Sequence, residues 1–237
     1  MSKARLYSSL LIFKLLWYNQ VMRKEKNVRG EYYHVINRGN NKQTIFKDER
    51  DLARFLFLIL YFQSPVGLCN ISRQVAYFLK NDEFNVSKIA TKEITENRNV
   101  ELIAFVLMPN HFHLILKEHK ENGISNYMQR ILTSHSKYFN AKNKTTGHLF
   151  QGPFKIILIK DDPQLLYLSA YAHNNARELK RWNGREHLFP WSSYQDYVGE
   201  NRWGELLKPD IILDQFPNKE KYKSFVQKSG AKEISKK

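Results

Sequence analysis

Two apolar runs in the middle of the chain limit the folds that it can adopt. Residues 100–108 read VELIAFVLM, residues 111–117 read HFHLILK, and only Pro109 and Asn110 separate them. Short runs rich in aliphatic and aromatic side chains are typical of strands, and proline and asparagine favour turns. The sequence therefore predicts two short strands around a Pro-Asn turn, with the second strand in the core.

The segments on either side add two more strands and three helices. Residues 31–38 (EYYHVINR) and 154–160 (FKIILIK) have the composition or alternation of strands. Helical periodicity begins at Asp48 and recurs after residue 123, and a third helix is predicted from Asp162, as N-cap, and Pro163 to about residue 179. The apolar positions of the first two helices are Leu52, Phe55, Leu56, Ile59 and Leu60, then Ile124, Met128, Ile131, Leu132 and Phe139.

The order of these elements predicts an α+β fold. Strand, helix, strand, strand, helix, strand and a further helix match a split βαβ arrangement, in which helices pack on one face of an antiparallel sheet. We expect one domain over residues 22–199, with residues 64–99 as an insertion that has local structure. Residues 1–21 are interpreted as an N-terminal extension from a misassigned start codon, since Met22 opens a stretch typical of a protein start. Residues 200–237 are predicted to be a lysine-rich, frayed tail.

The charge of the chain favours a polyanionic partner. Its 237 residues include 38 lysines and arginines against 23 acidic residues, a formal net charge of +15. A merely soluble basic protein would show the same surplus. The single cysteine, Cys69, excludes an internal disulfide framework and a thiolate zinc cluster, and it favours a reducing cytoplasm. The apolar stretch at residues 6–21 is too short and interrupted to span a membrane.

The clearest chemical signal is the triplet His111-Phe112-His113. Because strand side chains alternate, the two imidazoles share one face and Phe112 enters the other. Such a pair is half of a divalent-metal site. By spacing alone, two inert hydrogen-bonded histidines are the more frequent explanation.

The third predicted helix carries a candidate nucleophile. Tyr171 and Asn175 lie four residues apart and so share a helical face. A tyrosine oxygen can attack a phosphodiester, a nearby metal can offset the developing charge, and Asn175 can add an amide oxygen ligand. By helical pattern alone, Tyr171 would be read as an ordinary core aromatic.

Four blocks, taken in order, resemble one family of enzymes. GEYYHVINRGNNKQTIF, AFVLMPNHFHLILK, GHLFQGPFK and YLSAYAHNNARELK are similar to the REP-associated tyrosine transposases, which are single-tyrosine HUH nucleases related to the IS200-like transposases. The resemblance runs from about residue 22 to about residue 199.

The resemblance implies a ferredoxin-like sheet, a following helix with the nucleophile, a Mg²⁺ or Mn²⁺ ion, and a single-stranded DNA substrate with hairpin structure. The family cleaves through a 5′-phosphotyrosine intermediate and rejoins strands, and its members are commonly homodimers. His111 and His113 match the histidine pair, Tyr171 matches the nucleophile, and Asn175 matches the residue that completes the metal set. Two positions depart from the family: Ala176 replaces a proline after Asn175, and Pro153 replaces an arginine in the loop.

A basic and aromatic surface is predicted to hold the DNA. Its residues are Arg38, Lys42, Lys137, Tyr138, Lys142, Lys144 and Lys155. Tyr138, close to several lysines, is the second candidate nucleophile, and it could instead stack a base. A solvated charged face is the alternative for the whole set.

Two other functions remain open on the sequence. The chain could be a domesticated relative that binds DNA hairpins without cutting them, or an RNA-binding protein that uses the same basic sheet. The histidine pair and Tyr171 favour the transposase-like enzyme, because simple binding needs neither a metal pair nor an aligned nucleophile. Whether Tyr171 meets the histidines of its own chain or those of a partner is not fixed by the sequence.

Overall fold

A four-stranded antiparallel sheet forms the centre of the molecule. The computed structural model describes residues 27–65 and 70–230, and within these ranges β1 (Tyr32–Arg38), β2 (Val100–Met108), β3 (His111–Glu118) and β4 (Lys155–Ile159) pair in the order β2-β3-β1-β4. β3 runs antiparallel to both β1 and β2, so β1 and β2 are parallel with β3 inserted between them. This is the split βαβ order that the sequence predicted, and the α+β, ferredoxin-like fold class is confirmed.

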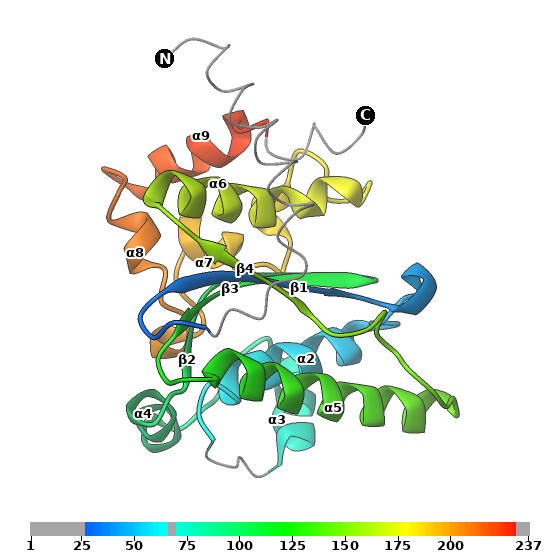
Figure 1. Cartoon of the computed structure of the whole chain (residues 1–237). Helices are drawn as coiled ribbons and strands as arrows, with labels where there is room; N and C mark the ends of the chain where they lie inside the picture. The colour runs from blue at the N-terminus through cyan, green and yellow to red at the C-terminus, as the bar shows by residue number, and fades with distance from the viewer. Residues whose placement is uncertain (1–26, 66–69, 231–237) are drawn as a thin grey trace.

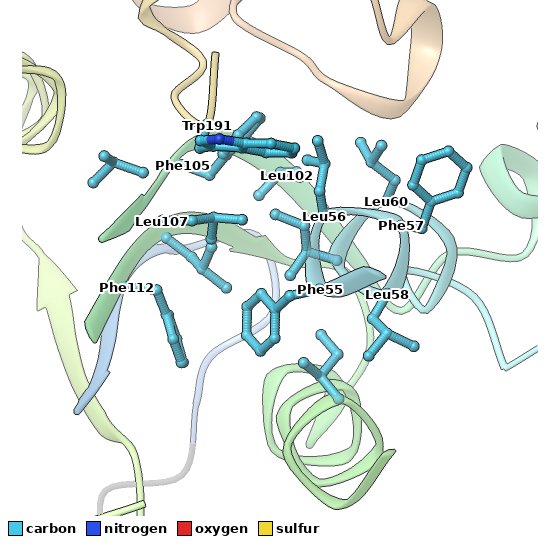
Figure 2. Close-up of a cluster of buried hydrophobic side chains, with 14 of the residues drawn as sticks. Phe55, Leu56, Phe57, Leu58, Leu60, Leu102, Phe105, Leu107, Phe112 and Trp191 are labelled. Atoms are coloured by element: carbon cyan, nitrogen blue, oxygen red, sulfur yellow. The ribbon is translucent and has the colours of Figure 1, made fainter. Parts of the chain in front are cut away.

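Two helices cover one face of the sheet. Figure 1 shows α2 (Glu49–Tyr61) and α5 (Gly123–Asn143) side by side below the strands, with α3 (Ile71–Asn81) and α4 (Lys88–Glu96) further out. In Figure 2, Phe112 and Leu107 of the sheet point toward Phe55 and Leu56 of α2. The rings of Phe55 and Phe112 lie 5.0 Å apart, so Phe112 occupies the face that the strand alternation predicted.

The third helix covers the opposite face. α6 (Asp162–His173) crosses above the strands in Figure 1, with α7 (Tyr194–Val198), α8 (Asp210–Leu213) and α9 (Lys219–Lys228) on the same side. A second apolar cluster fills this layer and includes Ile115 of β3, Leu165 and Leu168 of α6, and Tyr197 of α7. The sheet therefore lies between two helical layers, and Tyr171 belongs to the layer opposite α2 and α5.

The start and the end of this helix differ slightly from the prediction. Asp161, rather than Asp162, is the N-cap, and its side chain accepts a hydrogen bond from the backbone of Gln164. The α-helix ends at His173, and a 3-10 turn, η2 (Asn174–Glu178), continues it. The other 3-10 turns are η1 (Asn40–Lys42), η3 (Glu186–Leu188) and η4 (Gly204–Leu206).

The prediction of a frayed tail after residue 200 is wrong for the residues that the structure describes. Residues 200–230 fold back onto the α6 face or the α2 layer and bury several large side chains, namely Trp203, Leu206, Leu207, Ile212, Tyr222 and Val226. The expectation was wrong because the lysines of α9 occupy its solvent side, while Tyr222 and Val226, four residues apart, form a buried stripe.

The other predicted boundaries have different outcomes. Within residues 64–99, α3 and α4 supply the local structure that was expected, and Val75, Phe78 and Ile94 join the main core. The predicted extension at residues 1–21 lies outside the described residues. None of the helices in the described ranges combines the length and the apolar character that a bilayer crossing requires.

Candidate active site

The strand register places both predicted metal ligands on the α6 face of the sheet. His113 is paired with Ile36 of β1 and Val106 of β2, and His111 is paired with Arg38 and Met108. Each histidine is only 4% exposed, and their ring centroids are 5.2 Å apart. Two imidazoles on a central strand are thus held side by side and away from bulk water.

A third histidine lies next to this pair. His34 of β1 is two residues before Ile36 and points to the same face. Its Nε2 lies 3.0 Å from Nδ1 of His113, within hydrogen-bond distance. Burial lowers the pKa of His34 to about 3, so the ring is uncharged near neutral pH.

Tyr171 reaches the histidines from above. Its ring meets the ring of His113 edge to face, with centroids 5.4 Å apart, and that of His34 at 6.4 Å. The side chain of Tyr171 is partly exposed, unlike the histidines below it. The chain thus brings its own tyrosine to its own histidine pair, as α6 packs across β2, β3 and β4.

Asn175 completes the group. Its Nδ2 donates to the backbone carbonyl of Tyr171 at 2.7 Å, which turns its Oδ1 toward Nε2 of His111 at 3.3 Å. The helical spacing of Tyr171 and Asn175 predicted a shared face, and the two do share it although Asn175 already belongs to the 3-10 turn. Tyr171, His111, His113 and Asn175 are therefore brought together.

The hydrogen-bond partners of His111 indicate whether one of its ring nitrogens is available to a cation. Asn110 donates its Nδ2 to the carbonyl of Lys42, and so presents Oδ1 to Nδ1 of His111 at 2.7 Å. A neutral imidazole has one N–H, and in the tautomer that could bind a cation this N–H lies on Nδ1 and donates to Asn110. The lone pair of Nε2 then faces the lone pairs of Asn175. Atoms that share a cation about 2.1 Å from each lie roughly 3.0–3.4 Å apart, so this pair has the spacing of two adjacent ligands.

The side chains of His111, His113 and Asn175 are few but chemically compatible with a divalent ion. Two imidazoles and one amide oxygen are ligands that Mn²⁺ or Mg²⁺ can accept beside water and phosphate oxygens. Within residues 27–65 and 70–230, no group of three or more histidine, cysteine, aspartate or glutamate side chains is arranged to hold a metal. His111, His113 and Asn175 would supply three ligands to such an ion, and its other positions would be open to a substrate.

Three of the predicted DNA-contact residues lie at the edge of this site. Arg38 is paired with His111, and Lys155 of β4 is paired with Ile36, so both belong to the histidine face of the sheet. Lys42 lies in η1, directly after β1, and is exposed. These three residues surround the end of the strands where the imidazoles are.

The other four lie on α5, on the opposite side of the sheet. They are Lys137, Tyr138 and Lys142 within the helix and Lys144 at its C-cap. Lys142 forms ion pairs with Asp48 at 2.6 Å and with buried Asp51 at 2.5 Å. Tyr138 donates to Asp51 at 3.1 Å, and burial together with that carboxylate raises the pKa of Tyr138. The structure does not bring these residues to the histidine pair, which leaves Tyr171 as the better placed nucleophile.

Two residues of the site were not assigned from the sequence. The sequence alone does not assign His34 to the site, because its alternation with Ile36 and Arg38 places it on the face of His113 only once β1 is paired with β3. Asn110 was read only as a turn residue. Its hydrogen bond to His111 could not be found without the position of the Lys42 carbonyl.

Comparisons with known proteins found a similar solved structure and a matching family model. A solved structure, described as a REP-associated tyrosine transposase bound to a REP hairpin, aligns with 80% of this chain and 92% of its own, at 15% identity and a TM-score of 0.48. No match to a curated protein was found. The family model described as "Transposase IS200 like" matches residues 66–175. The segment that carries His111, His113, Tyr171 and Asn175 thus matches the IS200-like transposase family, and the resemblance that the sequence blocks indicated is confirmed over these residues.

Proposed function

We propose that this chain is a transposase-like enzyme that cuts single-stranded, hairpin-bearing DNA and rejoins it through a 5′-phosphotyrosine intermediate. The observation that carries the proposal is the convergence of Tyr171 and Asn175 with His111 and His113. His113 and Tyr171 are in ring contact, and Asn175 bonds the backbone of Tyr171 and faces His111. A protein that only binds DNA has no need for this combination.

Tyr171 is the nucleophile in this proposal. Its hydroxyl oxygen attacks the phosphorus atom, a tyrosine–phosphate bond forms, and the bond to the 3′ oxygen breaks to leave a free 3′-hydroxyl. The partial exposure of Tyr171 lets the phenolic proton pass to water, and the leaving 3′ oxygen takes a proton from water. In rejoining, a 3′-hydroxyl attacks the phosphotyrosine and the phenol is released.

A divalent ion would be held by Nε2 of His111, by His113 and by Oδ1 of Asn175. When bound, the ion would polarise the scissile phosphate and offset the charge that develops on its oxygens. Because the three ligands lie on β3 and on η2, the chain fixes their orientation before DNA binds.

Basic residues would position the DNA strand. Arg38 and Lys155 lie on the histidine face and Lys42 lies beside it, so their cationic groups can bind phosphates on either side of the scissile bond. The net charge of +15 supports a nucleic-acid substrate in general.

A covalent-trapping assay tests the proposal. The protein is incubated with labelled single-stranded hairpin DNA from the flanks of its own gene, with Mn²⁺ or Mg²⁺, and the products are separated on a denaturing gel. We expect a metal-dependent protein–DNA band, a released 3′-hydroxyl fragment, and loss of both in Tyr171→Phe.

Tyr167→Phe is the matched control, because Tyr167 lies one turn earlier on the same helix. It should leave the covalent band unchanged, and Tyr138→Phe should do the same. A Tyr171→Phe protein with every activity intact would contradict the proposal. Tight hairpin binding with no covalent band, across several hairpins, would indicate a non-cutting binding protein instead.

A further inference from the structure

The position of His34 lowers the stability of the fold. It is 1% exposed, and its Nδ1 is buried with no hydrogen-bond partner among the described residues. A buried polar nitrogen that is left unsatisfied destabilises a fold by about 1–3 kcal/mol. An apolar ring at this position would avoid that penalty, so packing alone does not explain an imidazole here.

His34 and His113 are in direct contact through one nitrogen of each ring. The two rings are tilted by only 18°, and their centroids are 5.1 Å apart. That separation equals the 3.0 Å between Nε2 of His34 and Nδ1 of His113 plus roughly one ring radius at each end. The two rings are therefore nearly parallel and meet through these two nitrogens, and the bond limits how the ring of His113 can turn.

We propose that His34 is a positioning residue for the metal site: its Nε2 accepts the Nδ1 hydrogen of His113, and thereby fixes the ring and directs Nε2 of His113 to the cation. The inference rests on the proposed function only in taking His113 as a metal ligand. A histidine that binds a metal through one nitrogen holds its hydrogen on the other, and a partner for that hydrogen sets the tautomer.

The opposite arrangement of the same bond would disable the site. If Nε2 of His34 donated, Nδ1 of His113 would accept, and the hydrogen of neutral His113 would sit on Nε2. No lone pair would then remain on Nε2 for a cation. His34 thus determines, by the direction of one hydrogen bond, whether His113 can act as a ligand.

Nitrogen-15 NMR of the histidine rings tests the direction of the bond. Long-range proton–nitrogen spectra of the full chain are recorded without metal and with saturating Mg²⁺, which is diamagnetic. We expect the hydrogen of His113 on Nδ1 and that of His34 also on Nδ1 in the Mg²⁺ spectrum. A hydrogen on Nε2 of His113 in both spectra would overturn the inference. If no Mg²⁺ binds, the metal-free tautomer decides alone in the same way.

Mn²⁺ binding to variants gives a second readout. His34→Phe keeps a ring but removes the acceptor, and we expect Mn²⁺ affinity, measured by electron paramagnetic resonance, to fall by about 10–100-fold while the unfolding midpoint is unchanged or higher. His34→Gln offers a carbonyl oxygen and should retain most of the affinity. His135→Gln alters another buried histidine, on α5, and should leave Mn²⁺ binding unchanged.

The outcomes separate this inference from the proposed function. Equal Mn²⁺ affinity in the wild-type chain and in folded His34→Phe would reject the role of His34, even if a covalent DNA product forms. A wild-type chain that binds Mn²⁺ in a His34-dependent way but yields no covalent product would reject the proposed chemistry and leave the role of His34 intact.

Discussion

The side-chain oxygen of Asn175 lies 3.3 Å from Nε2 of His111, although β3 and the end of α6 are far apart in the sequence. The amide of Asn175 is fixed by its donation to the backbone carbonyl of Tyr171 at 2.7 Å. One residue therefore connects the backbone of the proposed nucleophile, Tyr171, to the histidine pair. A displacement of α6 would move Tyr171 and the proposed metal ligand Asn175 together.

Substitutions at Asn175 should change metal binding in opposite directions. Asn175→Asp keeps an oxygen and adds a negative charge, so Mn²⁺ should bind more tightly. Asn175→Ala removes the oxygen, and affinity should fall by at least about tenfold, the lower bound for losing even an outer partner of a ligand. Both are measured by Mn²⁺ titration. Asn174→Ala is the control, because Asn174 points instead to the carbonyl of Val226, and equal losses at both positions would exclude a direct role for Asn175.

The contact between Tyr171 and His113 within one chain predicts an active site that needs no partner residues. A mixture of Tyr171→Phe and His113→Ala proteins should therefore form no covalent DNA product. In a site shared between two chains, mixed dimers would contain one intact site. A covalent band in the mixture, but in neither variant alone, would show a shared site. The homodimer expected from the family stays a prediction in either case.

The two groups of basic residues should differ in their effect on DNA. Arg38→Gln and Lys155→Gln act on the histidine face, and each should weaken hairpin binding and reduce the salt dependence of the binding constant by about one phosphate contact. Lys137→Gln lies on α5, across the sheet, and should change neither. Binding is measured by fluorescence anisotropy at several salt concentrations. A stronger effect of Lys137→Gln than of Lys155→Gln would move the DNA path to the α5 side.

The C-terminal helix α9 should stabilise the fold through its contact with α6, the helix that carries Tyr171. Tyr222 donates its hydroxyl toward Ser169 at 3.1 Å and lies 2.7 Å from Nδ1 of His173, both on α6. Tyr222→Phe leaves these buried groups without that partner and should lower the free energy of unfolding by about 1–3 kcal/mol in urea titrations. Tyr77→Phe, at an exposed position bonded to Glu83, should change it by less than about 0.5 kcal/mol. Equal unfolding midpoints for both variants would mean that α9 is not held by this network.

Local periodicity was enough to predict the parts of the site that lie within one element. Alternation along β3 put His111 and His113 on one face and Phe112 on the other, and helical spacing put Tyr171 and Asn175 together. Each of these relationships depends only on local geometry, along β3 in the first case and along α6 and the 3-10 turn that continues it in the second. The order of elements then predicted the sheet, because a split βαβ unit has few alternatives.

The features that the sequence did not predict, or predicted wrongly, depend on contacts between elements. The role of His34 requires the β1–β3 register, which alternation within β1 does not supply. The lysines of α5 were grouped with the DNA-binding surface because they are basic and lie among aromatic residues in the sequence. In the structure, the sheet separates them from the histidine pair. The segment after residue 200 was read as a tail because its buried residues, such as Trp203 and Tyr222, are spread over short irregular elements.

A buried histidine on α5 gives the fold a pH-dependent stability. His135 is 0% exposed, and its Nε2 donates to the carbonyl of Ile45 at 2.9 Å. Burial among Phe46, Phe55 and neighbouring rings lowers the pKa of His135 to about 4, from an ordinary value of 6.5. Because the folded-state pKa is the lower one, the unfolded chain binds more protons between these values. Stability from this residue is therefore complete above about pH 6.5 and is lost as the pH falls toward 4.

The size of this loss can be measured against a variant that does not titrate. One pKa unit corresponds to about 1.4 kcal/mol, so His135 should account for roughly 3 kcal/mol of destabilisation between neutral pH and pH 4. His135→Gln can still donate to the Ile45 carbonyl but cannot take up a proton. Urea unfolding of both proteins from pH 7 to pH 4.5 should show a shallower decline for the variant. Parallel declines would mean that His135 is hydrated in the folded chain, and that acid acts on other groups.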